Sequence, residues 1–288
     1  MKKNIKNILE YFLLISFYKI SNFIGIRFSS LLGGLVLFVY GKFSLKNKIA
    51  LKNLNKVFPS KNLKQKKTII NRMWFHFGRV IGEYPHLEKF NALGSENITI
   101  EGLENLTDPL KKNKNCLFFS AHLGNWELTS HPLTELGYTI SFIYRPPNNP
   151  FVDNLLRRIR KKYGVNLIRK GPSGAKECIK VLKSNKGNIG MLMDQKMNDG
   201  IKANFFGYEV MTASAIARFA IKFKCPIIPA ICKRVNGTRF LIKYYPEIKY
   251  EKILELESEL NIINYLNRYI ETWIKESPEQ WIWVHNRW

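Results

Sequence analysis

The segment Phe118-Phe119-Ser120-Ala121-His122-Leu123-Gly124-Asn125-Trp126-Glu127 joins a short apolar run to a polar turn. The apolar part is typical of a buried strand, and the glycine that follows favours a turn before a helix. Strands that lead into helices are the repeating unit of α/β sheets. The segment therefore predicts an α/β fold in which His122 lies where a strand ends.

Beyond residue 97, short apolar runs alternate with helical patterns in the same way. The runs predict strands at residues 98–101, 116–120, 139–144, 165–168, 189–193, 227–231 and 240–245. Predicted helices cover residues 125–136, 150–163, 173–184, 212–223 and 258–276. Residues 46–87 indicate further helices with a break at Phe58-Pro59-Ser60. We expect one α/β domain over residues 46–288, with a single mixed sheet flanked by helices.

The chain has a strong excess of positive charge. Its 288 residues include 46 Lys+Arg and 22 Asp+Glu, a formal net charge of +24, and 45% of them are hydrophobic. So much apolar material excludes a disordered basic tail, and the charge indicates anionic partners such as nucleic acid, phosphorylated lipids or an acidic protein. A compositional bias toward Lys, Asn and Ile, as in an AT-rich genome, is an alternative origin of the charge.

The cysteines give no indication of a metal site. Cys116, Cys178, Cys225 and Cys232 form no C-x-x-C pair and have no histidine at zinc-finger spacing. We expect free thiols in a reducing compartment.

Residues 1–45 are predicted to form a membrane anchor. Residues 8–43 are almost wholly apolar or small, with charges only at Glu10, Lys19, Arg27 and Lys42. The uncharged part, residues 28–41, is shorter than the roughly 20 residues that span a bilayer, and a longer span would include Arg27. Crossing the membrane and lying in its interface both remain open. The many lysines after residue 42 predict a domain on the cytoplasmic face, held against anionic headgroups.

The spacing of His122 and Glu127 restricts how they can meet. Within one regular helix, five residues turn the chain by about 500°, so the two side chains would point about 140° apart. They can touch only if His122 lies outside the helix. In that arrangement the carboxylate would orient the imidazole, and the other ring nitrogen would take a proton from a hydroxyl group. A structural histidine is the commoner explanation for such an isolated pair.

Other catalytic motifs are missing from the sequence. It has no G-x-S-x-G elbow, Walker A loop or G-x-G-x-x-G fingerprint. The sequence therefore gives no support for a covalent serine intermediate, for phosphoryl transfer from a nucleotide or for dinucleotide-dependent chemistry. Direct transfer of a group to an acceptor hydroxyl remains.

Several blocks together resemble the lipid A late acyltransferases, called lauroyl or myristoyl acyltransferases, within the glycerolipid acyltransferase superfamily. The resemblance covers nearly the whole chain and rests on the order and spacing of these blocks: Asn53-Leu54 with Phe58-Pro59, His122 to Glu127, Tyr144-Arg145-Pro146 with Asn149-Pro150, Met193-Asp194-Gln195, Asn204-Phe205-Phe206-Gly207 with Thr212, and Pro278-Glu279-Gln280-Trp281-Ile282-Trp283-Val284-His285. The family's tail commonly reads His-Arg-Arg-Trp, whereas this chain ends His285-Asn286-Arg287-Trp288.

The resemblance implies an O-acyltransferase domain with His122 as general base and Glu127 as its partner. For substrate binding it implies Asp194 and Gln195, and the residue types add Arg145 for a phosphate and Phe205 and Phe206 for an acyl chain. Arg145 paired with a structural carboxylate, Asp194 capping a turn, and ordinary core aromatics are the structural alternatives.

The resemblance also implies the substrates and the location. The donor would be an acyl thioester of acyl carrier protein, the acceptor a hydroxyl of a phosphorylated lipid A precursor, and the site the cytoplasmic face of a bacterial inner membrane. No metal and no dissociable cofactor are implied. One alternative is acyl transfer to another glycolipid or a glycerophospholipid. Another is a membrane-tethered basic protein that binds nucleic acid without catalysis; we expect no nucleic acid partner, because no recognisable RNA-binding module is present.

Overall fold

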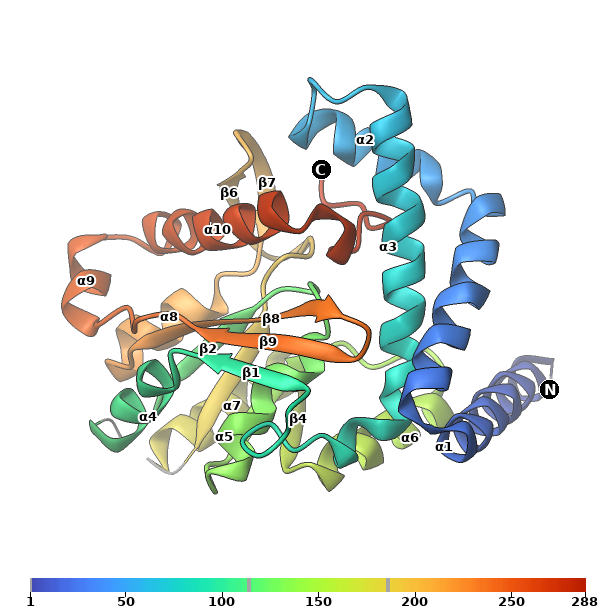
Figure 1. Cartoon of the computed structure of the whole chain (residues 1–288). Helices are drawn as coiled ribbons and strands as arrows, with labels where there is room; N and C mark the ends of the chain where they lie inside the picture. Colours follow the sequence, from blue (N-terminus) through green and yellow to red (C-terminus); the bar gives the residue numbers. More distant parts are fainter. Residues whose placement is uncertain (1, 113–114, 185–186) are drawn as a thin grey trace.

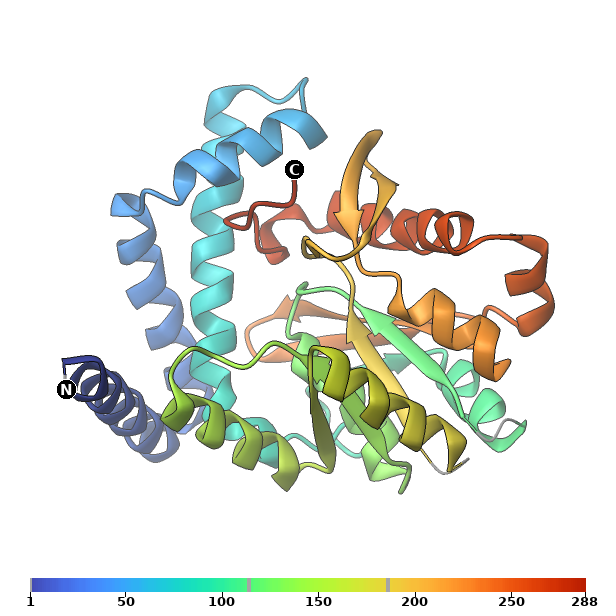
Figure 2. The same ribbon diagram turned by 180° about the vertical axis from the view of Figure 1, so that it is seen from behind.

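A mixed seven-stranded sheet with helices on both faces forms the body of the molecule (Figures 1 and 2). The computed structural model describes residues 2–112, 115–184 and 187–288. The strand order is β1-β9-β8-β2-β5-β3-β4. All neighbouring strands are parallel except β8 and β9, which form an antiparallel hairpin. The predicted α/β fold with a mixed sheet and a long apolar N-terminal helix is confirmed.

The elements have the following bounds. The strands are β1 (Ile98–Glu101), β2 (Leu117–Ser120), β3 (Ile140–Tyr144), β4 (Val165–Arg169), β5 (Asn188–Leu192), β6 (Ile201–Phe205), β7 (Tyr208–Thr212), β8 (Ile227–Asn236) and β9 (Arg239–Tyr244). The helices are α1 (Lys2–Phe43), α2 (Asn47–Val57), α3 (Leu63–Glu83), α4 (Leu103–Lys112), α5 (His131–Glu135), α6 (Pro150–Lys162), α7 (Pro172–Lys183), α8 (Ala215–Phe223), α9 (Tyr250–Glu255) and α10 (Glu259–Glu276). Short 3-10 helices are η1 (Tyr84–Lys89), η2 (Trp126–Ser130) and η3 (Pro278–Gln280).

Two hydrophobic cores lie on opposite faces of the sheet, because successive residues of a strand point to opposite sides. In β2, Leu117 and Phe119 pack into the core that includes residues of α7, α8 and α10. Phe118 packs into the second core, which includes residues of α4, α5 and α6. The central strands are therefore buried on both faces, as their continuous apolar sequences indicate.

The seven predicted strands all form, with ends that shift by a few residues. The predicted elements did not include the antiparallel β6–β7 hairpin, whose turn is Phe206-Gly207, nor the helices α4 and α9. The single helix predicted at residues 125–136 is wrong: η2 is followed by the short α5. Pro132 accounts for the break, because a proline cannot donate the helical hydrogen bond and its ring crowds the carbonyl four residues earlier.

Helix α1 has two halves that meet at Gly25, whose backbone is non-helical with φ 78° and ψ 163°. The second half lies along α3, side by side in both views (Figures 1 and 2). Glycines make this contact close: a Cβ built on Gly78 would collide with the Gly33 carbonyl, and one on Gly33 with the Gly78 carbonyl. Ser29 Oγ donates a hydrogen bond to the Gly82 carbonyl in the same contact. Small residues thus bring the two backbones together.

Replacing Gly78 with alanine tests how closely α1 and α3 pack, because helix propensity and packing change the free energy of unfolding in opposite directions. Propensity alone favours alanine by about 1 kcal/mol, but the clash with Gly33 predicts a net loss of about 1–3 kcal/mol in the free energy of unfolding. Denaturant unfolding of the full chain measures the difference. As a control, Thr68→Ala on the exposed face of α3 should change stability by less than about 0.5 kcal/mol. A Gly78→Ala protein more stable than the wild type would show that α1 and α3 are not closely packed.

Candidate active site

The candidate site lies where parallel strands of the sheet end. His122 follows β2, Asp194 follows β5 and Arg145 follows β3. In the β2–β5 ladder Ser120 pairs with Leu192. His122 and Asp194 each come two residues later, so the register places them side by side. This carboxyl edge is the usual location of ligands in open α/β sheets.

His122 and Asp194 form a hydrogen-bonded pair. Nδ1 of His122 lies 2.9 Å from Oδ1 of Asp194, and the Trp281 indole Nε1 donates to Oδ2 at 2.8 Å. The Asp194 side chain is 1% exposed, whereas the His122 side chain keeps 22% of its surface exposed. Because the carboxylate accepts from Nδ1, the proton of a neutral imidazole sits there and Nε2 carries the free lone pair.

The environment keeps Asp194 ionised. Burial by itself raises the pKa of this carboxyl group, but the charge and hydrogen bond of His122, together with the Trp281 hydrogen bond, lower it to about 2. Asp194 can therefore fix the tautomer of His122 and stabilise its protonated form.

The turn after His122 is fixed by glycine. Gly124 has φ +61°, and a Cβ at this position would collide with the Cys232 carbonyl of β8. The Gly124 amide donates to the Gln280 carbonyl at 3.1 Å, and Leu123 forms an isolated β-bridge with Trp281. The turn is thus attached both to the sheet and to the C-terminal segment.

The contact expected between His122 and Glu127 is not the one that the structure shows. Glu127 accepts hydrogen bonds from Arg160 Nη2 at 2.6 Å, Arg160 Nε at 2.9 Å and Tyr163 at 2.8 Å, and also from Tyr84. Among the described residues, none of its hydrogen bonds goes to His122. The reason is that Glu127 lies in the first turn of η2 and its side chain bonds to Arg160 of α6, while the ring of the intervening Trp126 packs edge-to-face with that of His122, 5.1 Å between centroids.

Buried contacts explain the charge state of Glu127. Burial raises the pKa of this carboxyl group, but the Arg160 charge and the hydrogen bonds from Arg160, Tyr84 and Tyr163 outweigh it and lower the pKa to about 2. The guanidinium of Arg160, the partner of this carboxylate, is largely buried, which by itself lowers its pKa, but the negative charge of Glu127 outweighs burial and raises its pKa.

A second buried carboxylate holds the turn from the other side. Glu83, at the end of α3, is fully buried and forms a bidentate ion pair with Arg234 of β8, with N–O distances of 2.5 and 2.8 Å. It also accepts from Ser30 of α1 at 2.6 Å and from the Asn125 side chain at 2.9 Å. One carboxylate therefore connects α1, α3, the sheet and the turn that carries His122.

The other predicted site residues lie in different surroundings. Arg145 is exposed at the end of β3, and in the described part of the chain no carboxylate is recorded as its partner. Gln195 is half-buried beside Asp194. Phe205 is fully buried, with its ring 5.6 Å from that of Trp288, and the half-buried Phe206 packs edge-to-face with it at 4.9 Å.

The C-terminal segment contributes residues to the site that the sequence reading did not assign. Besides Trp281, His285 accepts a hydrogen bond at Nε2 from the Lys196 amide, 3.0 Å away. Burial lowers the pKa of His285 to about 4. Arg287, fully buried, donates to the Met211 carbonyl and to Thr212 Oγ1. The aromatic block near the C-terminus was the signal in the sequence for these residues. Only the tertiary structure shows that this block lies close to Asp194.

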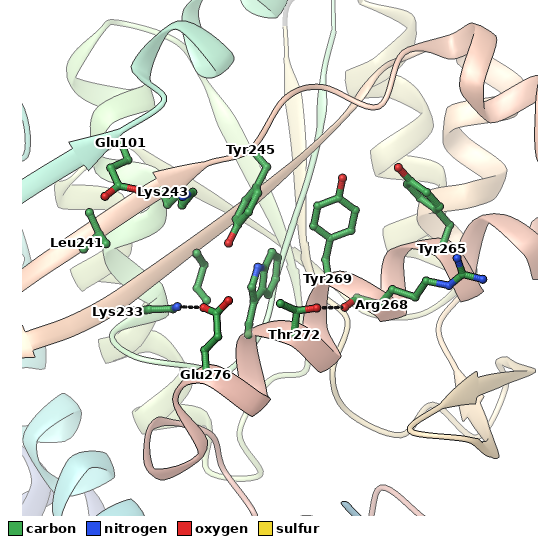
Figure 3. A pocket seen from close by; sticks show the side chains of 12 residues that line it. Glu101, Lys233, Leu241, Lys243, Tyr245, Tyr265, Arg268, Tyr269, Thr272 and Glu276 are labelled. Carbon is green, nitrogen blue, oxygen red and sulfur yellow. Dashed lines mark hydrogen bonds and ion pairs between the residues drawn. The ribbon is translucent and has the colours of Figure 1, made fainter.

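Two cavities differ in their relation to the predicted site residues. A small cavity of about 50 Å³ is lined largely by apolar side chains, including Trp126, Phe142, Leu167 and Leu192, with Glu127 and Arg160 at its wall. A larger groove of about 450 Å³ lies between α10 and strands β8 and β9 (Figure 3). None of the predicted site residues lines this groove.

The groove of Figure 3 is lined by two lysine–glutamate pairs, Arg268 and tyrosine rings. Lys233 is paired with Glu276, and Lys243 lies 3.0 Å from Glu101.

No group of three or more His, Cys, Asp or Glu side chains placed to hold a metal ion occurs among the described residues. The arrangement at His122 is suited to proton transfer by a side chain.

Acid should weaken the fold through Glu127. Its pKa is lowered from about 4.5 to about 2, so its contribution is complete above pH 4.5 and is lost as the pH falls toward 2. The shift corresponds to stabilisation on the order of 3 kcal/mol. Unfolding free energies measured from pH 6 to pH 3 should fall less steeply for Glu127→Gln than for the wild type. Glu104→Gln, which removes an exposed carboxylate, should keep the wild-type slope; equal slopes for all three proteins would contradict the assignment.

Comparisons with known proteins identify the family of this chain. The chain is 26% identical over 243 residues to a lipid A biosynthesis acyltransferase of Haemophilus influenzae, covering 81% of this chain and 72% of that protein. It is 24% identical over 248 residues to lipid A biosynthesis acyltransferase 2 of Shigella flexneri, covering 81% and 74%. The family model for bacterial lipid A biosynthesis acyltransferases matches residues 2–288. With a match over nearly its entire length, the chain belongs to this family of acyltransferases.

Proposed function

We propose that this enzyme transfers a fatty acyl group from the thioester of acyl carrier protein to a hydroxyl group of a phosphorylated lipid A precursor. Membership of the family supports acyl transfer in lipid A biosynthesis and a glycolipid acceptor. The observation that carries the chemistry is the His122 ring, held at Nδ1 by a buried carboxylate and partly exposed at the strand edge.

His122 acts as the general base in this proposal. Its Nε2 removes the proton of the acceptor hydroxyl while the oxygen attacks the thioester carbonyl. The tetrahedral intermediate then collapses, the C–S bond breaks, and the imidazolium returns the proton to the departing thiolate. Asp194 stabilises the imidazolium, because its carboxylate is buried and already ionised.

Glu127 is a positioning residue in the same proposal. Through Arg160, Tyr84 and Tyr163 it fixes the end of the turn that begins at His122. Its loss is therefore expected to lower activity together with stability, whereas loss of His122 affects activity alone.

The surroundings suggest where the substrates bind. Arg145 is exposed on the same edge as His122, and its guanidinium fork suits an acceptor phosphate. Phe205 is enclosed by other aromatic rings, so we do not assign it to the acyl chain, and the cavity of about 50 Å³ beside Trp126 has room only for the end of such a chain. The exposed Arg157 and Arg158 line a groove of about 250 Å³ on α6 that suits the acidic surface of a carrier protein.

Mass spectrometry of membrane lipids tests the function. Cells without the gene should lack one acyl chain on the lipid A precursor, and the wild-type gene should restore it. With purified protein, His122→Ala should lower the rate of transfer by about 10²–10⁴-fold. Asp194→Asn should lower it by on the order of 10²-fold or more, because an amide donates to the ring and favours the wrong tautomer.

Asp199→Asn is the matched control, since it removes an exposed carboxylate from the same loop and should keep full activity. Full activity of His122→Ala in a folded protein refutes the mechanism. A missing chain on a glycerophospholipid would instead assign the other acceptor class, and unchanged lipids with salt-sensitive binding of RNA or DNA would indicate a nucleic-acid-binding protein.

We also propose that α1 attaches the enzyme to the inner membrane from the cytoplasmic side. By length and composition, residues Asn4–Phe43 are the helix of the described chain that is apolar enough to cross a membrane. The outward side of its second half, here called the outer stripe, is exposed and apolar at i, i+3 and i+4 spacing: Phe28, Leu31, Leu32, Leu35, Val36, Val39, Tyr40 and Phe43. Such a face suits an interface between water and lipid.

Contacts on the inward side of α1 favour attachment over crossing. Ser29 and Ser30 bond to α3 residues, and in the first half Tyr11 and Tyr18 pack against the second core. The Asn149 side chain, in the loop after β3, donates to the Asn7 carbonyl at 2.8 Å. A helix held along both halves by the domain cannot also be surrounded by lipid, so we place it in the plane of the membrane surface.

Flotation with vesicles tests this attachment. Replacing Leu35 and Val39 together by glutamate removes apolar burial of about 1.5–3 kcal/mol per side chain, so binding should fall by about 10²-fold or more. The control pair Leu254→Glu and Leu260→Glu alters equally exposed apolar residues of α9 and α10 and should float like the wild type. Equal behaviour of the two variants would remove the outer stripe from the membrane contact.

A further inference from the structure

Three arginines surround a second concave surface, away from His122. The concavity has a volume of about 510 Å³ and lies where α1, α3 and the β8–β9 hairpin meet. Arg27 comes from α1, Arg79 from α3 and Arg239 from the start of β9. Leu31, Glu96, Asn97 and the hairpin residues Asn236, Gly237 and Thr238 complete the lining. We call this surface the arginine cradle.

The cradle has an unbalanced positive charge. Glu96 is the acidic residue of its lining, against three guanidinium groups. In the described part of the chain, no salt bridge is recorded for Arg27, Arg79 or Arg239, in contrast to the paired lysines in the groove of Figure 3. Burial and the neighbouring Arg234 lower the pKa of Arg79, with partial compensation from Glu83. An anion bound in the cradle would supply the missing negative charge.

The cradle adjoins the apolar surface of α1. Leu31 belongs both to the lining and to the outer stripe, and Phe28, next to Arg27, is 71% exposed. Val235, at the end of β8 beside the hairpin turn, is 67% exposed. A molecule that contacts both surfaces must have an anionic group and apolar chains. Arginine forks match phosphate oxygens in pairs, which favours a phosphate over a single carboxylate.

We infer that the arginine cradle binds the phosphate of an anionic membrane phospholipid whose acyl chains lie against the outer stripe of α1. The site is separate from the catalytic one, because its lining includes neither His122 nor Asp194. Arg79 is the fixed member, since its Nε donates to Ser30 Oγ at 2.9 Å. Arg27 and Arg239 are exposed and complete the site from two other elements. Binding would fix α1 against α3 and the sheet at the membrane surface.

The test compares binding of the full chain to phosphatidylcholine vesicles with and without phosphatidylglycerol. Arg27→Gln with Arg239→Gln leaves the Arg79–Ser30 contact intact. A basic residue near an anionic surface contributes about a fivefold increase in affinity, so this pair should lower binding to phosphatidylglycerol vesicles by about 25-fold. The control pair Lys176→Gln with Lys180→Gln removes the same charge from the exposed face of α7 and should stay within about twofold of the wild type.

Two further experiments distinguish a specific phospholipid site from general electrostatic attraction and from binding of free phosphate. Arg27→Lys with Arg239→Lys keeps the charge but loses the forks, so about a fivefold loss is expected. Inorganic phosphate should displace the protein no better than chloride of equal ionic strength. The assignment would be overturned if Arg27→Gln with Arg239→Gln lost no more vesicle binding than the control pair Lys176→Gln with Lys180→Gln. Full binding by Arg27→Lys with Arg239→Lys would also overturn it, as would displacement of the protein by phosphate beyond that by chloride. His122→Ala should bind vesicles normally, so failure here is distinct from failure of the proposed catalysis.

Discussion

Two buried carboxylates hold the turn from His122 to Glu127, and the position of the His122 imidazole depends on them. Glu83 binds Arg234 and Asn125 on one side, and Glu127 binds Arg160 on the other. Buried charges are expensive unless they are paired and fully hydrogen-bonded, and both carboxylates meet that condition. Each connects elements far apart in sequence, so the turn is kept in place by the assembled fold and hardly at all by its own short helices.

The same contacts connect α1 to the candidate site. Ser30 of α1 and Asn125 of the turn after His122 both donate to Glu83, and Asn149, just beyond Arg145, bonds to the first half of α1. The surface that we assign to the bilayer is therefore connected to two of the strand ends that form the site. In the proposed function, an acceptor lipid reaches His122 without leaving the membrane surface, and its phosphate and that of the proposed bound phospholipid meet different arginines.

The pairing of His122 with Asp194 separates the roles of the two neighbouring carboxylates. Glu127, five residues along the chain, stabilises the turn, and Asp194, which follows the adjacent strand β5, holds the His122 ring. This division is chemically reasonable, because the Glu127 carboxylate already accepts four hydrogen bonds from Arg160, Tyr84 and Tyr163. Trp281 and His285 add a contribution from the C-terminal segment, which closes the site against α2 through the hydrogen bonds of Asn53 to the Trp283 and His285 carbonyls.

Local patterns in the sequence were sufficient for the α/β class, the seven strands of the main sheet, the long apolar helix and the place of His122 at the end of a strand, because strand alternation and apolar runs are short-range signals. These patterns did not predict the structure after Asn125, where Pro132 separates η2 from α5 in place of one helix. They also did not predict the β6–β7 hairpin, whose strands are short. They could not determine which carboxylate meets His122. That depended on β2 lying next to β5 with Ser120 opposite Leu192, and strand order and register are set by the packing of the whole sheet, not by spacing along the chain.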